Sequence, residues 1–281
     1  MNFDQVILSG HRDIVLFDRN DPLSSPYVSR TIDGLGPTEA NVNVAQDTAG
    51  AGIYLGRRPS LREVVCNIHM NPDYTIGENP QSLRERLYFL RPITPDGSLL
   101  LKLMWQGAEV VRTAVYIKRI EVSPFTKDNL LQLVLAALRD TLEAPADVVL
   151  TNPNFNKTNP ILPNIGSAPT GFRATLTFTG SMFRIGFSQN GTNKYLSVTR
   201  QTLDNQFVAN DILEIDTRIG SRGVWLTRAG VKTSLLGFMD PQSAWLTLDP
   251  AETALTLMKR PEDSANFNWT SFRYRPQYLG V

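Results

Sequence analysis

Short runs of β-branched, aromatic and leucine residues, separated by turn signals, constrain the fold of this 281-residue chain most. In the run Leu99–Trp105, strand alternation places Leu101, Leu103 and Trp105 on one face and Lys102 on the other. Such runs predict many short β-strands. The other runs of this kind include Val6–Leu8, Ile14–Phe17, Val42–Val44, Val64–Ile68 and Val115–Ile117.

Glycine-containing dipeptides between the runs predict the turns. They occur at Asp33-Gly34, Asp96-Gly97, Thr179-Gly180 and Asn190-Gly191. Asn190-Gly191 predicts a hairpin, because both residues tolerate the positive φ angles of a tight turn. Arg228–Gly230 similarly separates Val224–Thr227 from Val231–Leu235. The chain is therefore expected to be mainly β.

One short helix is predicted over Pro80–Leu90. Asn79 can cap it, proline suits the first helical position, and Pro92 ends it. The apolar positions recur at i, i+4 and i+7, at Leu83, Leu87 and Leu90.

The segment Asn129–Leu142 is ambiguous from its residues alone. Its leucine and alanine content favours a helix, whereas the alternation of Leu131, Leu133 and Leu135 favours a strand. Periodicity does not separate these alternatives in a short apolar run.

Residues 151–170 are predicted to connect two domains. This stretch is rich in proline and asparagine, a composition that sustains neither a helix nor a central strand. The length of the chain also suits about two domains. We therefore expect domains over residues 1–150 and 171–281, joined by a linker over residues 151–170.

Composition excludes several classes of protein. Lys+Arg is 28 and Asp+Glu is 27, a net charge of +1 without a strongly basic half, unlike a typical nucleic-acid binder. The single cysteine, Cys66, cannot form an intrachain disulfide and fits a reducing cytosol. The sequence predicts neither a secretory signal nor membrane insertion.

Motifs for phosphate, metal or nucleophile chemistry are not convincing. Gly50–Gly56 and Gly186–Gly191 are glycine-rich, but they depart from the nucleotide-binding patterns in spacing or in the required lysine. His11, His69 and Cys66 are too few for a zinc site of the histidine and thiolate type. His69 is expected on a strand and Cys66 in the core.

Glu214 and Asp216 form the nearest approach to a catalytic acid pair. Residues i and i+2 on a strand lie roughly 6.5–7 Å apart, near the spacing of inverting glycosidases. Because Leu213 and Ile215 would form the apolar face, we expect both carboxylates on a solvated face instead. No catalytic, cofactor-binding or metal residue is therefore predicted, and no cofactor.

Four tryptophans are candidates for stacking on sugars, although tryptophan is also a common core residue of β-sandwiches. They are Trp105, Trp225, Trp245 and Trp269.

An ordered set of weak motifs adds a family resemblance. In the first half these are Tyr27-Val28, Ile32–Gly36, Gly50–Gly52, Arg62–Val65 and the helix Pro80–Leu90 with Gly97–Leu99. In the second half they are Asn164–Thr170, Asn210–Thr217, Ser243–Leu248 and Tyr274–Val281. Together they resemble the siphophage distal tail proteins. Asp249–Glu252 departs from the proline-glycine that is common in that family.

The resemblance implies a fold and a structural role. It implies an N-terminal split β-barrel or sandwich domain with a short helix, followed by a galectin-like β-sandwich. In Asn129–Leu142 it implies a strand, with a turn at Arg139-Asp140. No enzymatic activity is implied.

The resemblance also implies partners. Residues 1–150 would form a homo-hexameric ring that joins the tail tube protein above to the tail-tip hub or baseplate below. Receptor-binding proteins would dock on the outer face, and genomic DNA would pass through the lumen without sequence readout. The protein would lie in the virion, at the tail tip, after assembly in the host cytoplasm.

Two other functions stay open. One is a carbohydrate-binding, lectin-like module that attaches the virion to the host surface through residues 165–281, resting on Trp225 and Trp245. The other is a cell-wall hydrolase that uses Glu214 and Asp216.

Overall fold

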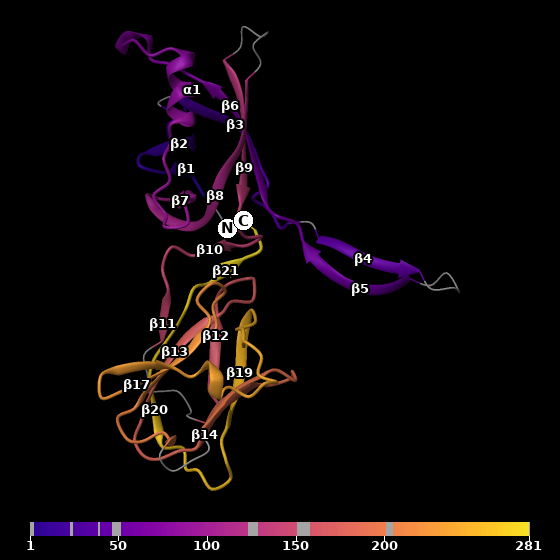
Figure 1. Cartoon of the computed structure of the whole chain (residues 1–281). Coiled ribbons are helices and arrows are strands. Elements are labelled where there is room, and N and C mark those ends of the chain that lie inside the picture. The colour runs from indigo at the N-terminus through magenta and orange to yellow at the C-terminus, as the bar shows by residue number, and fades with distance from the viewer. Residues whose placement is uncertain are drawn as a thin grey trace. The chain divides into compact units, whose positions relative to one another are not determined.

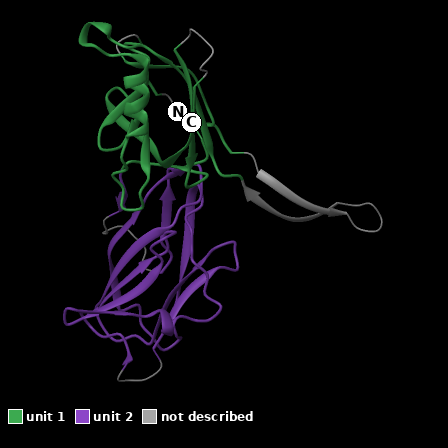
Figure 2. Cartoon of the chain, turned by 45° about the horizontal axis from the view of Figure 1, so that its top comes forward, with its two compact units in different colours: residues 1–145, 278–281 green, residues 146–277 purple. Residues whose placement is uncertain are grey.

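The computed structural model divides the chain into two compact units (Figures 1 and 2). Unit 1 comprises residues 1–145 and 278–281, and unit 2 comprises residues 146–277. The structure describes residues 3–22, 25–38, 40–46, 52–122, 129–150, 158–200 and 205–280, with the backbone alone for 40–46 and 52–59.

Unit 1 is built on one antiparallel sheet with the strand order β2-β1-β7-β8-β9-β6-β3, and the short strands β10 and β21 lie off this path. The strands are β1 (Gln5–Ser9), β2 (Asp13–Asp18), β3 (Tyr27–Asp33), β6 (Glu63–Met70), β7 (Leu99–Trp105), β8 (Ala108–Val122), β9 (Leu130–Ala137), β10 (Leu142–Glu143) and β21 (Gln277–Tyr278). A 3-10 helix, η1 (Tyr74–Ile76), and an α-helix, α1 (Pro80–Tyr88), follow β6.

The sheet of unit 1 curls without closing. Its two end strands, β2 and β3, contact each other although they do not pair. Near the start of β3, the hydroxyl of Ser25 donates a hydrogen bond of 2.8 Å to the carbonyl of Val15 on β2. The predicted split barrel with a short helix is confirmed.

Helix α1 begins as its sequence predicts. The side chain of Asn79 accepts a hydrogen bond from the backbone of Ser82, whose side chain accepts in return from the backbone of Asn79. Leu83 and Leu87 are buried in the core of unit 1. The hydroxyl of Tyr27 donates a bond of 2.6 Å to the Leu83 carbonyl, which ties β3 to the helix.

The ambiguous segment forms a strand. β9 pairs with β6 on one side and β8 on the other, and Leu131, Leu133 and Leu135 are buried. Residues 138–141 bend before β10, so the turn at Arg139-Asp140 is also confirmed. Burial of the alternating leucines outweighs the helical propensity of the segment.

A separate hairpin lies between β3 and β6 in the chain. It consists of β4 (Ala40–Gln46) and β5 (Gly52–Pro59), which pair antiparallel. The predicted strand Val42–Val44 lies within β4. Gly50 and Ala51, which belong to the glycine-rich stretch, lie outside the described residues.

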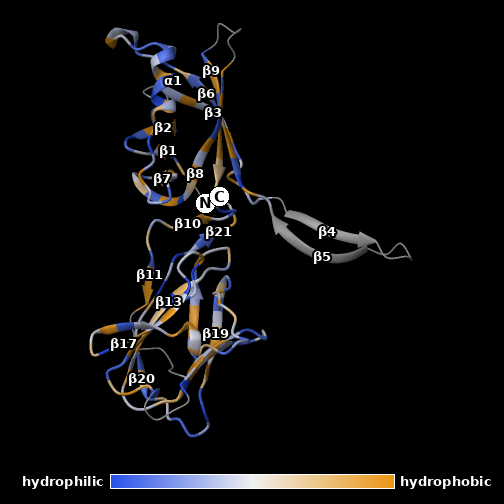
Figure 3. Cartoon of the chain, in the orientation of Figure 1, coloured by the Kyte–Doolittle hydropathy of each residue, from blue (hydrophilic) through white to orange (hydrophobic). Residues whose placement is uncertain are grey.

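Unit 2 is a sandwich of two antiparallel sheets around one core, which confirms the predicted β-sandwich. The six-stranded sheet has the order β11-β20-β13-β16-β17-β18, and the four-stranded sheet has the order β12-β19-β14-β15. Fully buried and half-buried residues alternate along Phe172–Phe178, and Figure 3 shows hydrophobic and hydrophilic residues along the strands of this unit. The strands are β11 (Val148–Leu150), β12 (Ile161–Asn164), β13 (Phe172–Phe178), β14 (Arg184–Gln189), β15 (Tyr195–Thr199), β16 (Ile212–Asp216), β17 (Gly223–Arg228), β18 (Val231–Ser234), β19 (Ala251–Met258) and β20 (Phe267–Tyr274). A 3-10 helix, η3 (Leu236–Phe238), follows β18.

The two predicted hairpins of unit 2 differ in their turns. β17 and β18 are joined by Ala229 and Gly230, both at positive φ (50° and 80°), as a two-residue turn requires. Five residues separate β14 from β15, and Gly191 has a φ of 73°. The hairpin at Asn190-Gly191 is therefore present, with a longer loop than a tight turn needs.

The expected linker is in part a strand. Residues 151–157 lie outside the described residues, but β12 pairs with β19 and buries Leu162. Ala168 and Thr170 are also buried in unit 2. Proline is tolerated in β12 because this strand lies at the edge of its sheet. Residues 158–170 thus belong to unit 2, and the units divide at residues 145/146.

Arg62 joins three distant segments of unit 1. Its side chain is 1% exposed, and its five N–H donors make five hydrogen bonds to four backbone carbonyls, which we call the Arg62 clamp. The bonds are 2.7 Å to Gly34, 2.7 Å to Gly36, 3.2 and 2.8 Å to Asp140, and 2.6 Å to Leu279. Burial lowers the pKa of the guanidinium, and the charge of Asp140 partly offsets this.

Replacement of Arg62 by lysine tests the clamp. Lysine keeps the charge but carries its donors on one nitrogen, so it leaves several buried carbonyls without a partner. We expect Arg62→Lys to lower the free energy of unfolding by about 3 kcal/mol in denaturant titrations.

Arg30→Lys is the matched control, because Arg30 is exposed on β3 and its replacement should change stability by no more than about 0.5 kcal/mol. Equal effects of the two variants would contradict the assignment.

Candidate functional site

The two carboxylates of β16 are held by cations. Glu214 accepts bonds from Arg173 on β13 at 2.5 Å and from Lys232 on β18 at 2.9 Å. Asp216 is buried, at 4% exposure, and pairs with Arg218 through contacts of 2.6 and 3.0 Å. The expectation of a solvated face was therefore wrong for Asp216, because the side chain of Arg218 covers it.

This arrangement does not suit acid catalysis. Burial works to raise the pKa of Glu214, but the bonds from Arg173 and Lys232 outweigh it and lower the pKa. A glycosidase acid needs the opposite shift, so that it holds a proton near neutral pH. The pair is better explained as part of an ion-pair network that holds three strands together.

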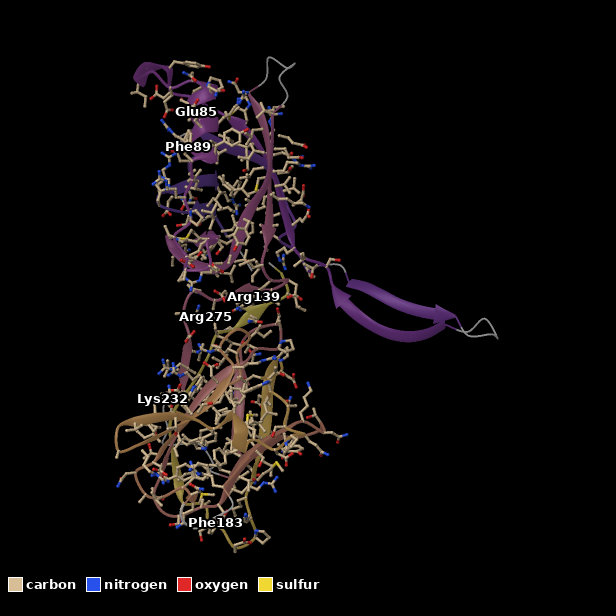
Figure 4. The ribbon with its side chains drawn as sticks, in the orientation of Figure 1. Glu85, Phe89, Arg139, Phe183, Lys232 and Arg275 are labelled. Carbon is tan, nitrogen blue, oxygen red and sulfur yellow. The ribbon has the colours of Figure 1, made fainter. Side chains whose placement is uncertain are left out.

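The tryptophans of unit 2 are already in contact with protein groups. The Nζ atom of Lys232, labelled in Figure 4, lies 4.8 Å from the centre of the Trp225 ring. The same ring fills the space beside Gly223, where an added Cβ would lie 2.3 Å from two ring carbons. Sugar stacking needs an open ring face, so these contacts weaken the lectin interpretation of Trp225.

The other tryptophans divide between core and surface. Trp269 is a core residue at 4% exposure. Trp245 packs against the same core, and Arg222 lies 5.9 Å from its ring centre. Trp105 is half-buried at the end of β7, in unit 1.

The residues considered for metal or thiol chemistry are dispersed. His11 accepts a hydrogen bond from the backbone of Arg91 at 2.9 Å, and His69 lies on β6, as predicted. Cys66 is fully buried in the core of unit 1, as predicted, and burial raises the pKa of its thiol to about 12. Within the described ranges, no group of three or more His, Cys, Asp or Glu side chains could hold a metal ion. Among the described helices, none is long and apolar enough to cross a membrane.

An exposed apolar surface on unit 1 was not predicted. Tyr74 and Ile76 on η1 are 67% and 72% exposed, and Tyr88 and Phe89 at the end of α1 are 58% and 70% exposed. These residues flank the two ends of α1, and we refer to the four together as the helix surface; Phe89 is labelled in Figure 4. The sequence did carry a signal for it, because Tyr88 and Phe89 lie off the leucine stripe that enters the core.

The helix surface has the character of a contact surface for another protein. Charged residues accompany it, including Arg86 and Glu78, which form an ion pair. Exposed apolar side chains rimmed by polar ones typically mark protein–protein contacts. We therefore regard the helix surface as the candidate assembly site of unit 1.

Comparison with known proteins finds a family model that is similar to most of unit 2. Residues 165–278 match the model of the siphovirus-type tail component, C-terminal domain. No curated protein matches the sequence.

Among solved structures, the fold is similar to the crystal structure of SPP1 Dit, described as a paradigm of the hub adsorption apparatus in phages that infect Gram-positive bacteria. The TM-score is 0.64 at 12% identity, covering 97% of this chain and 98% of the other. A chain of the phage P2 baseplate, in its activated conformation with Ca, aligns with a TM-score of 0.47 at 10% identity over both full chains. The similarity to SPP1 Dit shows a shared fold. The resemblance to siphophage distal tail proteins is confirmed.

Removal of the Glu214 carboxylate tests the ion-pair network. We expect Glu214→Gln to lower the stability of unit 2 by about 1 kcal/mol at pH 7, since the arginine and lysine partners are partly solvated and screened. Because the folded-state pKa of Glu214 is lowered, its contribution is present above pH 4–5 and disappears as the pH falls. The difference between wild type and variant, measured by thermal unfolding, should therefore shrink below about pH 4.

Glu121→Gln is the control for this experiment, because Glu121 forms an exposed ion pair with Arg119. A pH-independent loss in Glu214→Gln would show that the carboxylate charge is not responsible.

The burial of Cys66 predicts a slow thiol reaction. At pH 8 a thiol with a pKa of about 12 has very little thiolate, which is the reactive form. We expect the native chain to react with an alkylating reagent at least ~100-fold more slowly than the chain unfolded in denaturant. Mass spectrometry of timed samples measures both rates, and rapid labelling of the native chain would contradict the buried position.

Proposed function

Because residues 165–278 match the C-terminal domain of siphovirus-type tail components, we propose that this protein is a distal tail protein. Six copies form a ring that joins the tail tube to the tip or baseplate hub. The observation that carries this proposal is the similarity in fold to SPP1 Dit, which spans both units in the same chain order. A protein that lacked the ring-forming unit would align over unit 2 alone.

A ring makes a specific demand on unit 1. Identical subunits close into a ring through two different surfaces, each contacting the other on the next copy. The helix surface supports one of these contacts, because its four apolar side chains are exposed in the single chain. Subunit contacts would remove that apolar area from water.

The proposed role is structural and not enzymatic. Support comes from Glu214 and Asp216, which are engaged in ion pairs, and from the burial of Cys66. A net charge of +1 also suits a lumen through which DNA moves without being held. Unit 2 would then face outward as a platform for receptor-binding proteins in the virion, after assembly in the host cytoplasm.

Electron microscopy of virions, or of the protein mixed with assembled tail tubes, tests the ring. We expect six copies around the tail axis directly below the tube. A three-fold complement, or single scattered copies, would contradict the proposal.

Substitution of the helix surface gives a second test. Phe89→Asp should leave thermal stability within about 0.5 kcal/mol of wild type, because the side chain is already exposed, yet reduce ring incorporation at least ~10-fold. Ile165→Asp is the control, since Ile165 is similarly exposed, at 67%, but lies on unit 2. Rings that form equally well in both variants would exclude the helix surface from the subunit contact.

A further inference from the structure

The pair Asn190-Gly191, in the turn between β14 and β15, has a chemistry that the proposed function does not use. The backbone nitrogen of the residue after an asparagine can attack the side-chain amide of that asparagine. Glycine favours this attack most, because it has no side chain to obstruct the approach of the nitrogen. The sequence contains one Asn-Gly pair, and it is this one.

The structure leaves the pair open to water. Both residues are exposed, and so are the next three residues of the turn, 192–194. A Cβ added to Gly191 would meet no atom of the described residues within 4 Å beyond its chain neighbours. Hydroxide can therefore reach the amide of Gly191 and remove its proton, which the attack requires.

Strand β19 holds Asn190 in place. The hydroxyl of Thr256 donates a hydrogen bond of 2.7 Å to the amide oxygen of Asn190. The backbone N–H of Asn190 donates a bond of 2.9 Å to the carbonyl of Ala254. The bond from Thr256 polarises the side-chain carbonyl. It also points a donor at the oxygen that becomes negative during the attack, at a distance typical of oxyanion stabilisation.

The two Asp-Gly pairs of the chain lack this combination. An aspartate side chain reacts in the same way only when it is protonated, because a carboxylate is a poor electrophile. Hydrogen bonds from Thr94 and Ser98 lower the pKa of Asp96, so its acid form is scarce at neutral pH. A Cβ added to Gly34 would lie 1.8 Å from the carbonyl of Glu63, so strand β6 crowds that turn. Neither Asp-Gly pair therefore favours the reaction.

We propose that Asn190 is a site of spontaneous deamidation, promoted by Thr256. The backbone nitrogen of Gly191 loses its proton and forms a bond to the Cγ atom of Asn190. The bond from Cγ to the side-chain nitrogen breaks, and this nitrogen takes a proton from water and leaves as ammonia. Water then opens the cyclic imide at either carbonyl. One opening gives aspartate, and the other gives isoaspartate, in which the main chain runs through the side-chain carbon.

Both products change the turn between β14 and β15. Each product places a negative charge beside the hydroxyl of Thr256, and isoaspartate also lengthens the main chain of the turn. This exposed turn of unit 2 would then differ between newly made and aged protein. The modification is independent of ring formation, because it uses residues of unit 2 alone.

Incubation of the full chain at about pH 8 tests the proposal. Trypsin releases the peptide Ile185–Lys194, in which Asn193 is an internal control because lysine follows it. Tandem mass spectrometry of timed samples should show aspartate and isoaspartate forming at Asn190 at least ~10-fold faster than at Asn193. The native chain should also convert at least as fast as the chain unfolded in denaturant. Slower conversion in the native chain, or equal rates at the two asparagines, would overturn the proposal.

Thr256→Val is the decisive variant. Valine keeps the branched shape and removes the hydroxyl, so we expect deamidation of Asn190 to slow at least ~3-fold. Thr175→Val is the matched control, because Thr175 is also half-buried but lies on β13, in the other sheet. It should leave the rate unchanged. Deamidation at the wild-type rate in a folded Thr256→Val chain would overturn the proposal.

Discussion

Unit 1 depends on the hydrogen bonds of the Arg62 clamp. A buried guanidinium is tolerated only when its donors are satisfied, and here backbone carbonyls alone satisfy them. Gly34 lies at a φ of 89°, and an added Cβ would lie 1.8 Å from the Glu63 carbonyl, so the loop passes very close to β6. Displacement of any one of the three clamped segments leaves a buried donor unpaired. The segments are therefore coupled energetically although they lie far apart in the sequence.

The strands and the helix were predictable because their signals are local. Alternation in Leu99–Trp105 predicted β7 with the observed bounds, and the cap at Asn79 predicted the start of α1. The role of Arg62 was not predictable, because its partners are main-chain carbonyls, which every residue carries. Asp216 was predicted to face solvent for a related reason. Alternation describes which face of the strand Asp216 lies on, but it does not predict that the side chain of Arg218 folds back over the carboxylate.

The candidate sites show the same limit. The sequence identified Trp225 as a residue that could stack on a sugar. It did not predict that Lys232 and Gly223 contact the Trp225 ring. The contact with Lys232 depends on the hairpin β17–β18, and the contact with Gly223 depends on how the ring lies along its own strand.

The return of residues 278–281 to unit 1 has a consequence for biosynthesis. Arg62 and Leu279 are 217 positions apart, and the whole of unit 2 is translated between them. The ribosome therefore synthesises unit 2 before it makes Leu279, whose carbonyl is the last of the four that accept hydrogen bonds from Arg62. Until Leu279 is made, unit 1 holds a buried arginine with an unpaired donor, and its final stabilisation waits for that segment. Premature termination before Leu279 would therefore damage the first unit as well as the second.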